Sequence, residues 1–200
     1  MCRSLSEPAD PRAFAAELLR KALPTTEGDA TFDDAARAFL DLVCGAMNWC
    51  VGRVWRPDPA QPGLRLATAW AASGECGSAT HPATADVDST IPFSARTVVG
   101  DAVEQSAPVW REIVDDSRFV SLPADDPLRS RRLFAFPVIA DERVVAVLEF
   151  VADEPHDAIL LSSVLDLAVS RLSAIAEMEQ CEAERERLSA VVEHSVQPVF

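Results

Sequence analysis

The stretch that decides the fold runs from Leu133 to Ala152 and reads LFAFPVIADERVVAVLEFVA. Two runs rich in β-branched and aromatic residues flank a short polar group that begins at Asp141. Such runs, separated by only a few polar residues, predict a β-hairpin. The second run is largely apolar on both of its alternating faces, which indicates that other elements cover both sides. We therefore expect this hairpin at the centre of a sheet.

Two residues of the hairpin do not fit a plain central strand. Pro137 has no N–H for a ladder, so it should lie at a sheet edge, at a bulge or where strand pairing has stopped. Glu149 places a carboxylate in an apolar run. Because glutamate is rarely buried without a partner, a solvated carboxylate near the strand end is the simpler interpretation. The alternative is a carboxylate at the rim of a ligand cavity, which makes Glu149 a candidate ligand-binding residue.

Length and composition indicate one soluble domain with an appendage. The chain has 200 residues, of which 48% are hydrophobic, enough for a domain of about 150 residues and an extension. No apolar run approaches the roughly 20 residues that span a bilayer, and the start lacks a signal-peptide core, so we expect a cytoplasmic protein without membrane contact. Five cysteines without CxxC spacing favour reduced thiols over a disulfide framework or a zinc ribbon.

The charge balance excludes several classes of function. A net charge of −14 opposes binding to phosphate backbones, so nucleic acid is not an expected partner. Lys21 is the only lysine and has no glycine-rich loop beside it, which excludes P-loop nucleotide hydrolysis. His81, His156 and His194 lie too far apart in sequence to form a local metal motif, so no metal site is expected.

Four segments are expected along the chain. Residues 1–30 read as a leader with a short helix, 31–157 as the domain core, 158–193 as a long helix and 194–200 as a tail. Within the core, helical spacing of apolar residues predicts helices and alternation predicts strands. The elements expected before the hairpin are a helix over 31–47, strands over 49–56 and 64–73, a long loop over 73–90, a helix over 94–105, a short strand over 108–110 and a short helix over 127–131.

The long helix changes character along its length of about 50 Å, at about 1.5 Å per residue. From Glu177 to Arg187 it is charged throughout and should be poorly held against a globular body. Its first half carries an apolar seam with heptad spacing, which predicts a coiled coil that pairs two chains in parallel, although packing on the sheet can bury part of it. The seam consists of Leu161, Leu165, Ala168, Leu172 and Ile175.

Several local strings, in their order and spacing, resemble a GAF domain, the small-molecule sensing module of bacterial signalling proteins. The resemblance covers about residues 31–176 and is carried by AFL at 38–40, WCVGRVW at 49–55, VVGDAV at 98–103, APVW at 107–110, DSRF at 116–119, FAFPV at 134–138 and VVAVLEF at 144–150. It implies an α+β fold, in which helices flank a central antiparallel sheet of five or six strands. It also implies a ligand cavity between the sheet and the connection from Ser73 to Arg131.

The end of the chain, from Leu188 to Phe200, resembles the opening of a PAS domain; an ordinary helix end with a tail is the alternative. If the resemblance holds, the chain is the N-terminal sensor part of a longer protein, such as a two-component histidine kinase or a cyclic-di-nucleotide enzyme. The Cys-His pair of bilin-binding relatives and the Asn-Lys pair of the cyclic-nucleotide signature are missing from the sequence. Neither ligand is expected, and the cofactor or ligand is left unknown.

The candidate ligand-binding residues are chosen by their position near the implied cavity. Small-ligand sites are mostly apolar with a few polar groups. Core packing would explain each aromatic residue equally well. Arg96, at a helix start after a proline, is the only obvious anchor for an anionic ligand. With Glu149, the candidates are Trp70, Phe93, Arg96, Trp110, Phe119, Phe134 and Phe136.

Together these observations predict a non-catalytic sensor that binds a small molecule, forms a homodimer through its long helix and passes a conformational bias to an output domain. The competing prediction is a structural dimerisation domain whose cavity is filled by its own side chains. A third possibility is an enzyme, because some small GAF proteins resemble methionine sulfoxide reductases that work through cysteines. Cys50 and Cys76 would be the candidate thiols, without matching spacing.

Overall fold

The hairpin predicted between Leu133 and Ala152 forms strands β5 (Arg132–Ala140) and β6 (Arg143–Ala152) of a six-stranded antiparallel sheet. The computed structural model describes residues 31–47, 49–71, 90–119, 124–152 and 158–195. The other strands are β1 (Val51–Pro57), β2 (Gly63–Ala71), β3 (Thr90–Pro92) and β4 (Val109–Glu112), and the order across the sheet is β3-β2-β1-β6-β5-β4. The expected α+β fold is confirmed, with β1 and β6 as the central pair.

The turn and the proline of the hairpin both follow from backbone chemistry. Asp141 and Glu142 form a two-residue loop in which φ is 48° and 61°. A loop with two left-handed residues has the twist that suits antiparallel strands. β4 pairs with β5 only as far as Ala135, so the side of β5 away from β6 has no ladder at Pro137. The proline lies where pairing has stopped, as expected.

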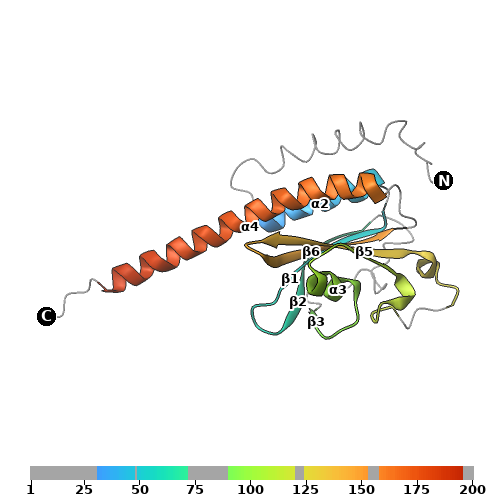
Figure 1. The fold of residues 1–200 in the computed structure, drawn as a ribbon, viewed down its shortest axis with the longest axis horizontal. Coiled ribbons are helices and arrows are strands. Elements are labelled where there is room, and N and C mark those ends of the chain that lie inside the picture. Colours follow the sequence, from blue (N-terminus) through green and yellow to red (C-terminus); the bar gives the residue numbers. More distant parts are fainter. Residues whose placement is uncertain (1–30, 48, 72–89, 120–123, 153–157, 196–200) are drawn as a thin grey trace.

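Helices cover both faces of the sheet (Figure 1). α2 (Phe32–Met47) and α4 (Ala158–Ser195) lie together on one face, called the helical face here, and α3 (Val98–Gln105) lies on the other, the α3 face. Each face has its own apolar core. Along β6, Leu148 belongs to the helical-face core, whereas Val147 belongs to the α3-face core. The central strands are therefore covered on both sides, as their two apolar faces predict.

α2 begins at a capping residue and packs closely on the sheet. The Thr31 hydroxyl accepts a hydrogen bond from the backbone N–H of Asp34 at 3.2 Å, which satisfies a donor at the helix start. A glycine in β1 allows the close approach of α2. A Cβ at Gly52 would lie 2.6 Å from Cys44 Sγ and 3.0 Å from Leu40 Cδ2, both side-chain atoms of α2. The absence of a side chain at Gly52 is thus a packing requirement.

The first half of α4 packs on its own domain. Leu165 and Leu172 are buried in the helical-face core, and Ile175 packs against that core. These three members of the predicted dimerisation seam therefore contact the sheet and α2 instead of facing a partner, because the same apolar spacing serves for packing on a sheet. The side chains of Leu161 and Ala168 lie outside the described residues. Dimerisation itself stays a prediction.

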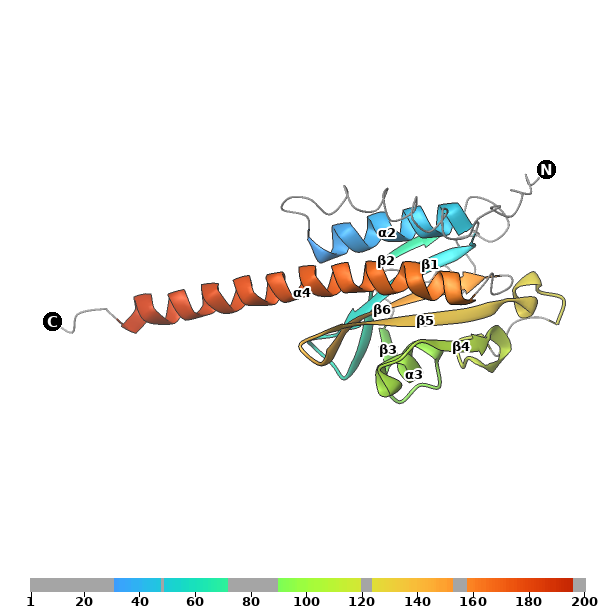
Figure 2. The ribbon, with the colours of Figure 1, turned by 45° about the horizontal axis from the view of Figure 1, so that its top comes forward.

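The second half of α4 projects beyond the sheet (Figure 2). At the point of departure, Glu179 Oε1 accepts a hydrogen bond from the backbone N–H of Phe32 at 2.6 Å. Side chains at positions 180–191 are exposed, as the charged composition predicts. The apolar side chains of Met178, Leu188 and Val191 are more than half exposed, at 63%, 59% and 57%. Leu188, in the projecting part, and Met178, just before it, are thus large apolar side chains that are mostly exposed in the described part of the chain.

Some expectations differ from the structure or lie outside it. β3 falls at the end of the segment expected to be a loop, because three residues are too few to show a period. The leader, most of the long loop and residues 196–200 of the tail lie outside the described residues, and α4 continues to Ser195. None of the helices in the described ranges has the length and apolar content needed to cross a membrane.

Candidate functional site

A buried carboxylate lies at the centre of the α3 face. Glu149 in β6 is fully buried and pairs directly with Arg53 in β1. Its Oε2 atom accepts hydrogen bonds from Arg53 Nη1 at 3.1 Å, Trp55 Nε1 at 2.8 Å and Arg118 Nη1 at 3.1 Å. Its Oε1 atom accepts one from Arg118 Nη2 at 2.5 Å. The interpretation of Glu149 as a solvated carboxylate is wrong, because two arginines and an indole satisfy it inside the domain.

Arg118 joins this carboxylate to the start of α3. Its Nε and Nη2 atoms donate to Asp116 Oδ1 and Oδ2, both at 2.9 Å. Asp116 is itself buried and accepts the backbone N–H of Val98 at 2.7 Å, at the first residue of α3. We call Arg53, Glu149, Asp116 and Arg118 the buried charge network. Two cations and two anions balance in it, and the planar fork of Arg118 binds both carboxylates.

The pKa values in the network follow from this pairing. Burial by itself raises the pKa of Glu149, but the charges of Arg118 and Arg53 and their hydrogen bonds outweigh it and lower the pKa from 4.5 to about 2. Burial lowers the pKa of Arg118, and the nearby carboxylates of Glu149 and Asp116 more than reverse this, so the pKa is raised. Both partners are therefore held in their charged forms.

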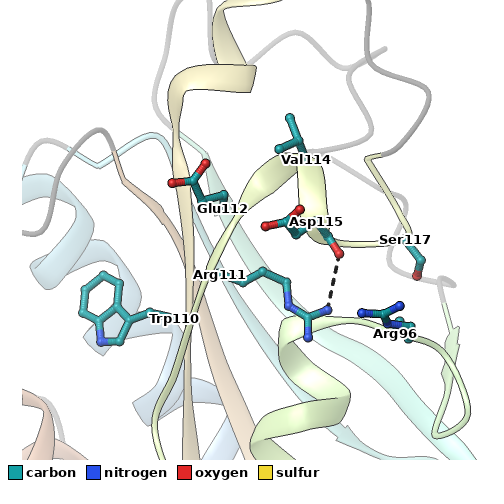
Figure 3. A pocket seen from close by; sticks show the side chains of 7 residues that line it. All are labelled: Arg96, Trp110, Arg111, Glu112, Val114, Asp115 and Ser117. Atoms are coloured by element: carbon teal, nitrogen blue, oxygen red, sulfur yellow. Dashed lines mark hydrogen bonds between the residues drawn. The ribbon is translucent and has the colours of Figure 1, made fainter.

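An open groove lies beside the network on the same face (Figure 3). Its volume is about 810 Å³, and it lies between β4, the segment after β4 and the loop before α3. Seven residues line it: Arg96, Trp110, Arg111, Glu112, Val114, Asp115 and Ser117. The backbone N–H of Ser117 donates to the carbonyl of Arg96 at 2.9 Å, which ties the two sides of the groove together.

The segment from Asp115 to Arg118 serves both the groove and the network. Asp115 and Ser117 line the groove, whereas Asp116 and Arg118 belong to the buried charge network. Neighbouring residues in this segment thus point to different environments. A change at the groove wall has a direct covalent route to the side chains that hold Glu149 in the central strand β6.

Arg96 and Arg111 are the two cations of the groove, and their environments differ. The Arg111 guanidinium pairs with Asp101 in α3 and approaches the carbonyl of Asp115 at 3.5 Å. The guanidinium of Arg96 is exposed and makes no hydrogen bond or ion pair with any residue that the structure describes. The part of Arg96 as an anchor for an anionic ligand stays a prediction.

The structure divides the candidate ligand residues between the two faces. Arg96 and Trp110 line the groove, and Phe119 is buried on the same face, with the Arg118 guanidinium 5.3 Å from its ring centre. The indole of Trp110, however, lies on the side of β4 away from Arg111 (Figure 3) and stacks on Phe134 at 3.8 Å. Phe93 is 47% exposed and does not line the groove.

Three other candidates lie on the helical face, away from the groove. Phe134 and Phe136 are buried in the helical-face core, and Trp70 packs against it. The indole N–H of Trp70 donates to Asp41 in α2 at 2.8 Å. None of the three lines this groove, and their part in ligand binding stays a prediction. Alternation shows which residues share a face, but it does not show which face carries a pocket when both are apolar.

The described cysteines do not form a pair of thiols. Cys44 is buried on the helical face and Cys50 on the α3 face, so the sheet separates them. Burial, with a smaller contribution from Asp41, raises the pKa of Cys44. Cys181 is exposed on α4. Cys76, the other thiol of the reductase alternative, lies outside the described residues.

Sequence reasoning missed Arg53, Arg111, Arg118 and the acidic wall of the groove. Arg53 was predicted on the same strand face as Trp49, Val51 and Trp55, and a charged residue among large apolar ones was the available signal of a buried pair. Arg111 gave no such signal, because its place beside Arg96 depends on the packing of α3 against β4.

A family model for the GAF domain matches residues 29–180 of the chain. The chain belongs to the GAF family. The match extends through the sheet, both of its faces and the half of α4 that packs on the helical face. No curated protein matches the chain in sequence.

Solved GAF structures share this fold at low sequence identity. The A. aeolicus nlh2 GAF domain in an inactive state has a TM-score of 0.63 at 12% identity, over 85% of this chain and 99% of that one. The GAF domain of an Acinetobacter phosphoenolpyruvate-protein phosphotransferase has a TM-score of 0.62 at 16% identity, over 85% and 97%. The free methionine-R-sulfoxide reductase of Neisseria meningitidis, in complex with its substrate, has a TM-score of 0.60 at 19% identity, over 86% and 96%. These likenesses establish the GAF fold, which by itself does not specify a function.

Proposed function

We propose that this GAF domain is a non-catalytic sensor, which binds a small molecule in the groove at Arg96 and passes the signal to an output domain through α4. The observation that carries the proposal is the segment from Asp115 to Arg118. It lines the groove with two residues and holds the buried charge network with the other two. A ligand that moves this segment would therefore act on the interior of the domain.

The proposed route of transmission runs through Arg118 and Glu149 to the central strand. Arg118 contacts Glu149 at 2.5 Å, and Glu149 belongs to β6, the strand that precedes α4 in the chain. The next residue, Phe150, lies in the helical-face core together with Leu165 and Leu172 of α4. If the ligand prefers one arrangement of Arg118, it shifts the population of the domain toward that arrangement. The free energy of this shift cannot exceed the difference between the ligand's binding free energies for the two states.

We propose a parallel homodimer through the projecting half of α4. This half exposes Leu188, and Met178 is exposed where α4 leaves the sheet; a second copy of the helix would cover both side chains. The output domain would follow α4 in a longer protein, as a histidine kinase or a cyclic-di-nucleotide enzyme. A weakly held helix suits this task, because little packing resists a change in its direction or register.

The test of the ligand site compares Arg96→Ala with a matched control. Arg65→Ala removes an exposed arginine from β2, outside the groove. Both variants and the parent chain are screened against a library of small metabolites by thermal shift, and hits are measured by calorimetry. The proposal expects at least one ligand whose affinity falls about tenfold or more in Arg96→Ala and is unchanged in Arg65→Ala. A hit that binds both variants equally would contradict the assignment of Arg96.

A structural dimerisation domain is the second candidate, and one specific observation favours it. The guanidinium of Arg118 is fully engaged with two carboxylates, so the centre of the α3 face is filled by the chain itself. In that case α4 would still dimerise, but no small molecule would change the melting temperature or the hydrogen exchange of β6. The same screen therefore separates the two candidates.

A further inference from the structure

The charges in the groove are separated into two ends. In Figure 3 the guanidinium groups of Arg96 and Arg111 point toward each other, with the Ser117 hydroxyl close to Arg96. The Asp115 carboxylate lies farther from Arg96 in this view than the Arg111 guanidinium does. The Glu112 side chain lies on the other side of β4, together with its ion-pair partner Arg132. The groove thus offers hydrogen-bond donors and positive charge at Arg96 and Ser117, and a negatively charged acceptor at Asp115.

Each end can still bind a charged group. The Arg96 guanidinium makes no ion pair with a described residue, and the Ser117 side chain is exposed. At the acidic end, the Asp115 side chain is exposed.

The charge of the whole chain selects among possible ligands. A net charge of −14 gives a negative field, which disfavours the approach of a simple anion. A simple cation is attracted by that field but meets two arginines inside the groove. A molecule with no net charge and two opposite charged ends avoids both penalties, because each end meets its complement.

We propose that the groove binds a small zwitterion, with its carboxylate at Arg96 and Ser117 and its ammonium group at Asp115. A free amino acid or a similar amino carboxylate has this chemistry. The volume of about 810 Å³ exceeds the roughly 30 Å³ of a water molecule many times, so such a ligand would bind together with ordered water. This inference rests on the proposed sensor function and names the class of ligand for the same groove.

The experiment uses a series of amino carboxylates whose charges are progressively further apart: glycine, β-alanine, γ-aminobutyrate and ε-aminocaproate. Butyrate, butylamine, caproate and hexylamine are matched probes that each lack one of the two charges. Binding of every probe to the full chain is measured by calorimetry or ligand-observed NMR at millimolar concentration. We expect at least one zwitterion to bind about tenfold or more tightly than both of its single-charge analogues.

Charge-removing variants then locate the two ends. Arg96→Ala and Asp115→Asn should each weaken the bound zwitterion about tenfold, because one end loses a charge-assisted hydrogen bond. Arg65→Ala and Glu142→Gln remove exposed charges outside the groove and should leave binding unchanged. Asp115→Asn should not weaken butyrate or caproate, since neither has an ammonium group. Circular dichroism confirms that each variant is folded.

Three outcomes would overturn the proposal of a zwitterionic ligand. One is equal affinity for an amino carboxylate and its amine-free analogue. If Arg96→Ala weakens this binding, the sensor function stands, with an anionic ligand in place of a zwitterion. Another is zwitterion binding that none of the groove variants affects, which would place the site elsewhere. The last is that no member of the series binds, while the metabolite screen finds another ligand whose affinity depends on Arg96. Failure of both the series and the screen would remove the sensor function as well.

Discussion

Replacing Glu149 by glutamine should lower the free energy of unfolding by about 3 to 5 kcal/mol. Glutamine keeps the shape of the side chain but removes the charge that Arg53 and Arg118 share. Two routes lead to this magnitude. Breaking a buried ion pair by removing one partner typically costs about 3 to 5 kcal/mol. The pKa of Glu149 is lowered from 4.5 to about 2, and each pKa unit corresponds to about 1.4 kcal/mol, which gives about 3 kcal/mol.

The same pKa shift predicts how the effect depends on pH. Because the pKa of Glu149 is lower in the folded than in the unfolded chain, its contribution is fully present above about pH 4.5 and is lost as the pH falls toward about 2. The difference in stability between the parent chain and Glu149→Gln should therefore be largest near neutral pH. It should shrink as the pH falls through that window.

Urea denaturation followed by tryptophan fluorescence measures this effect, with Trp55 as a reporter inside the network. Glu142→Gln, at an exposed position of the hairpin turn, is the matched control and should be nearly neutral. The double variant Arg53→Met with Glu149→Leu should be less destabilised than Glu149→Gln, because Arg118 keeps Asp116 and no buried charge is left without a partner. A loss below about 1 kcal/mol in Glu149→Gln, or one independent of pH, would refute the reasoning.

Two further predictions concern the packing of α2 on β1. Gly52→Ala should lower the free energy of unfolding by about 1 to 3 kcal/mol, because its Cβ would lie 2.6 Å from Cys44 Sγ. In urea denaturation, the double variant with Cys44→Ala should recover most of this loss. A Gly52→Ala variant as stable as the parent chain would contradict the close packing of α2 on β1. Alkylation at mildly alkaline pH, mapped by mass spectrometry, should modify the exposed thiol of Cys181 and leave Cys44 unmodified until the chain unfolds. The reason is that Cys44 is buried and its pKa is raised by burial. Equal labelling of the two cysteines in the folded chain would show that the packing of α2 does not protect Cys44.

Local patterns were enough to predict the main elements of the fold. The polar group at Asp141 defines the hairpin, and Pro137 marks the point where pairing with β4 has stopped. In the hairpin, alternation failed where the ladder is irregular. Val144 and Val145 are on the opposite faces from those that alternation predicts, because a register shift between Val138 and Ile139 leaves an extra residue in β6.

The candidate site was less predictable, because its residues come together only in the folded chain. Arg53 and Arg118 are 96 and 31 residues from Glu149 in sequence, and no local pattern connects them. Arg96 was found because it is a lone cation at a helix start, a local feature. The heptad spacing in α4 was genuine, but it could not show whether Leu165 and Leu172 pack on a partner or on their own sheet.

Native mass spectrometry of the freshly purified chain, at micromolar concentration and with an absorption spectrum, tests the proposed sensor most directly. The account predicts a dimer that carries the mass of a small molecule, or gains it on incubation with a zwitterion from the series, and that loses this mass in Arg96→Ala. A monomer would contradict pairing through α4. A dimer that carries and gains no mass would contradict the sensor and favour a structural dimerisation domain.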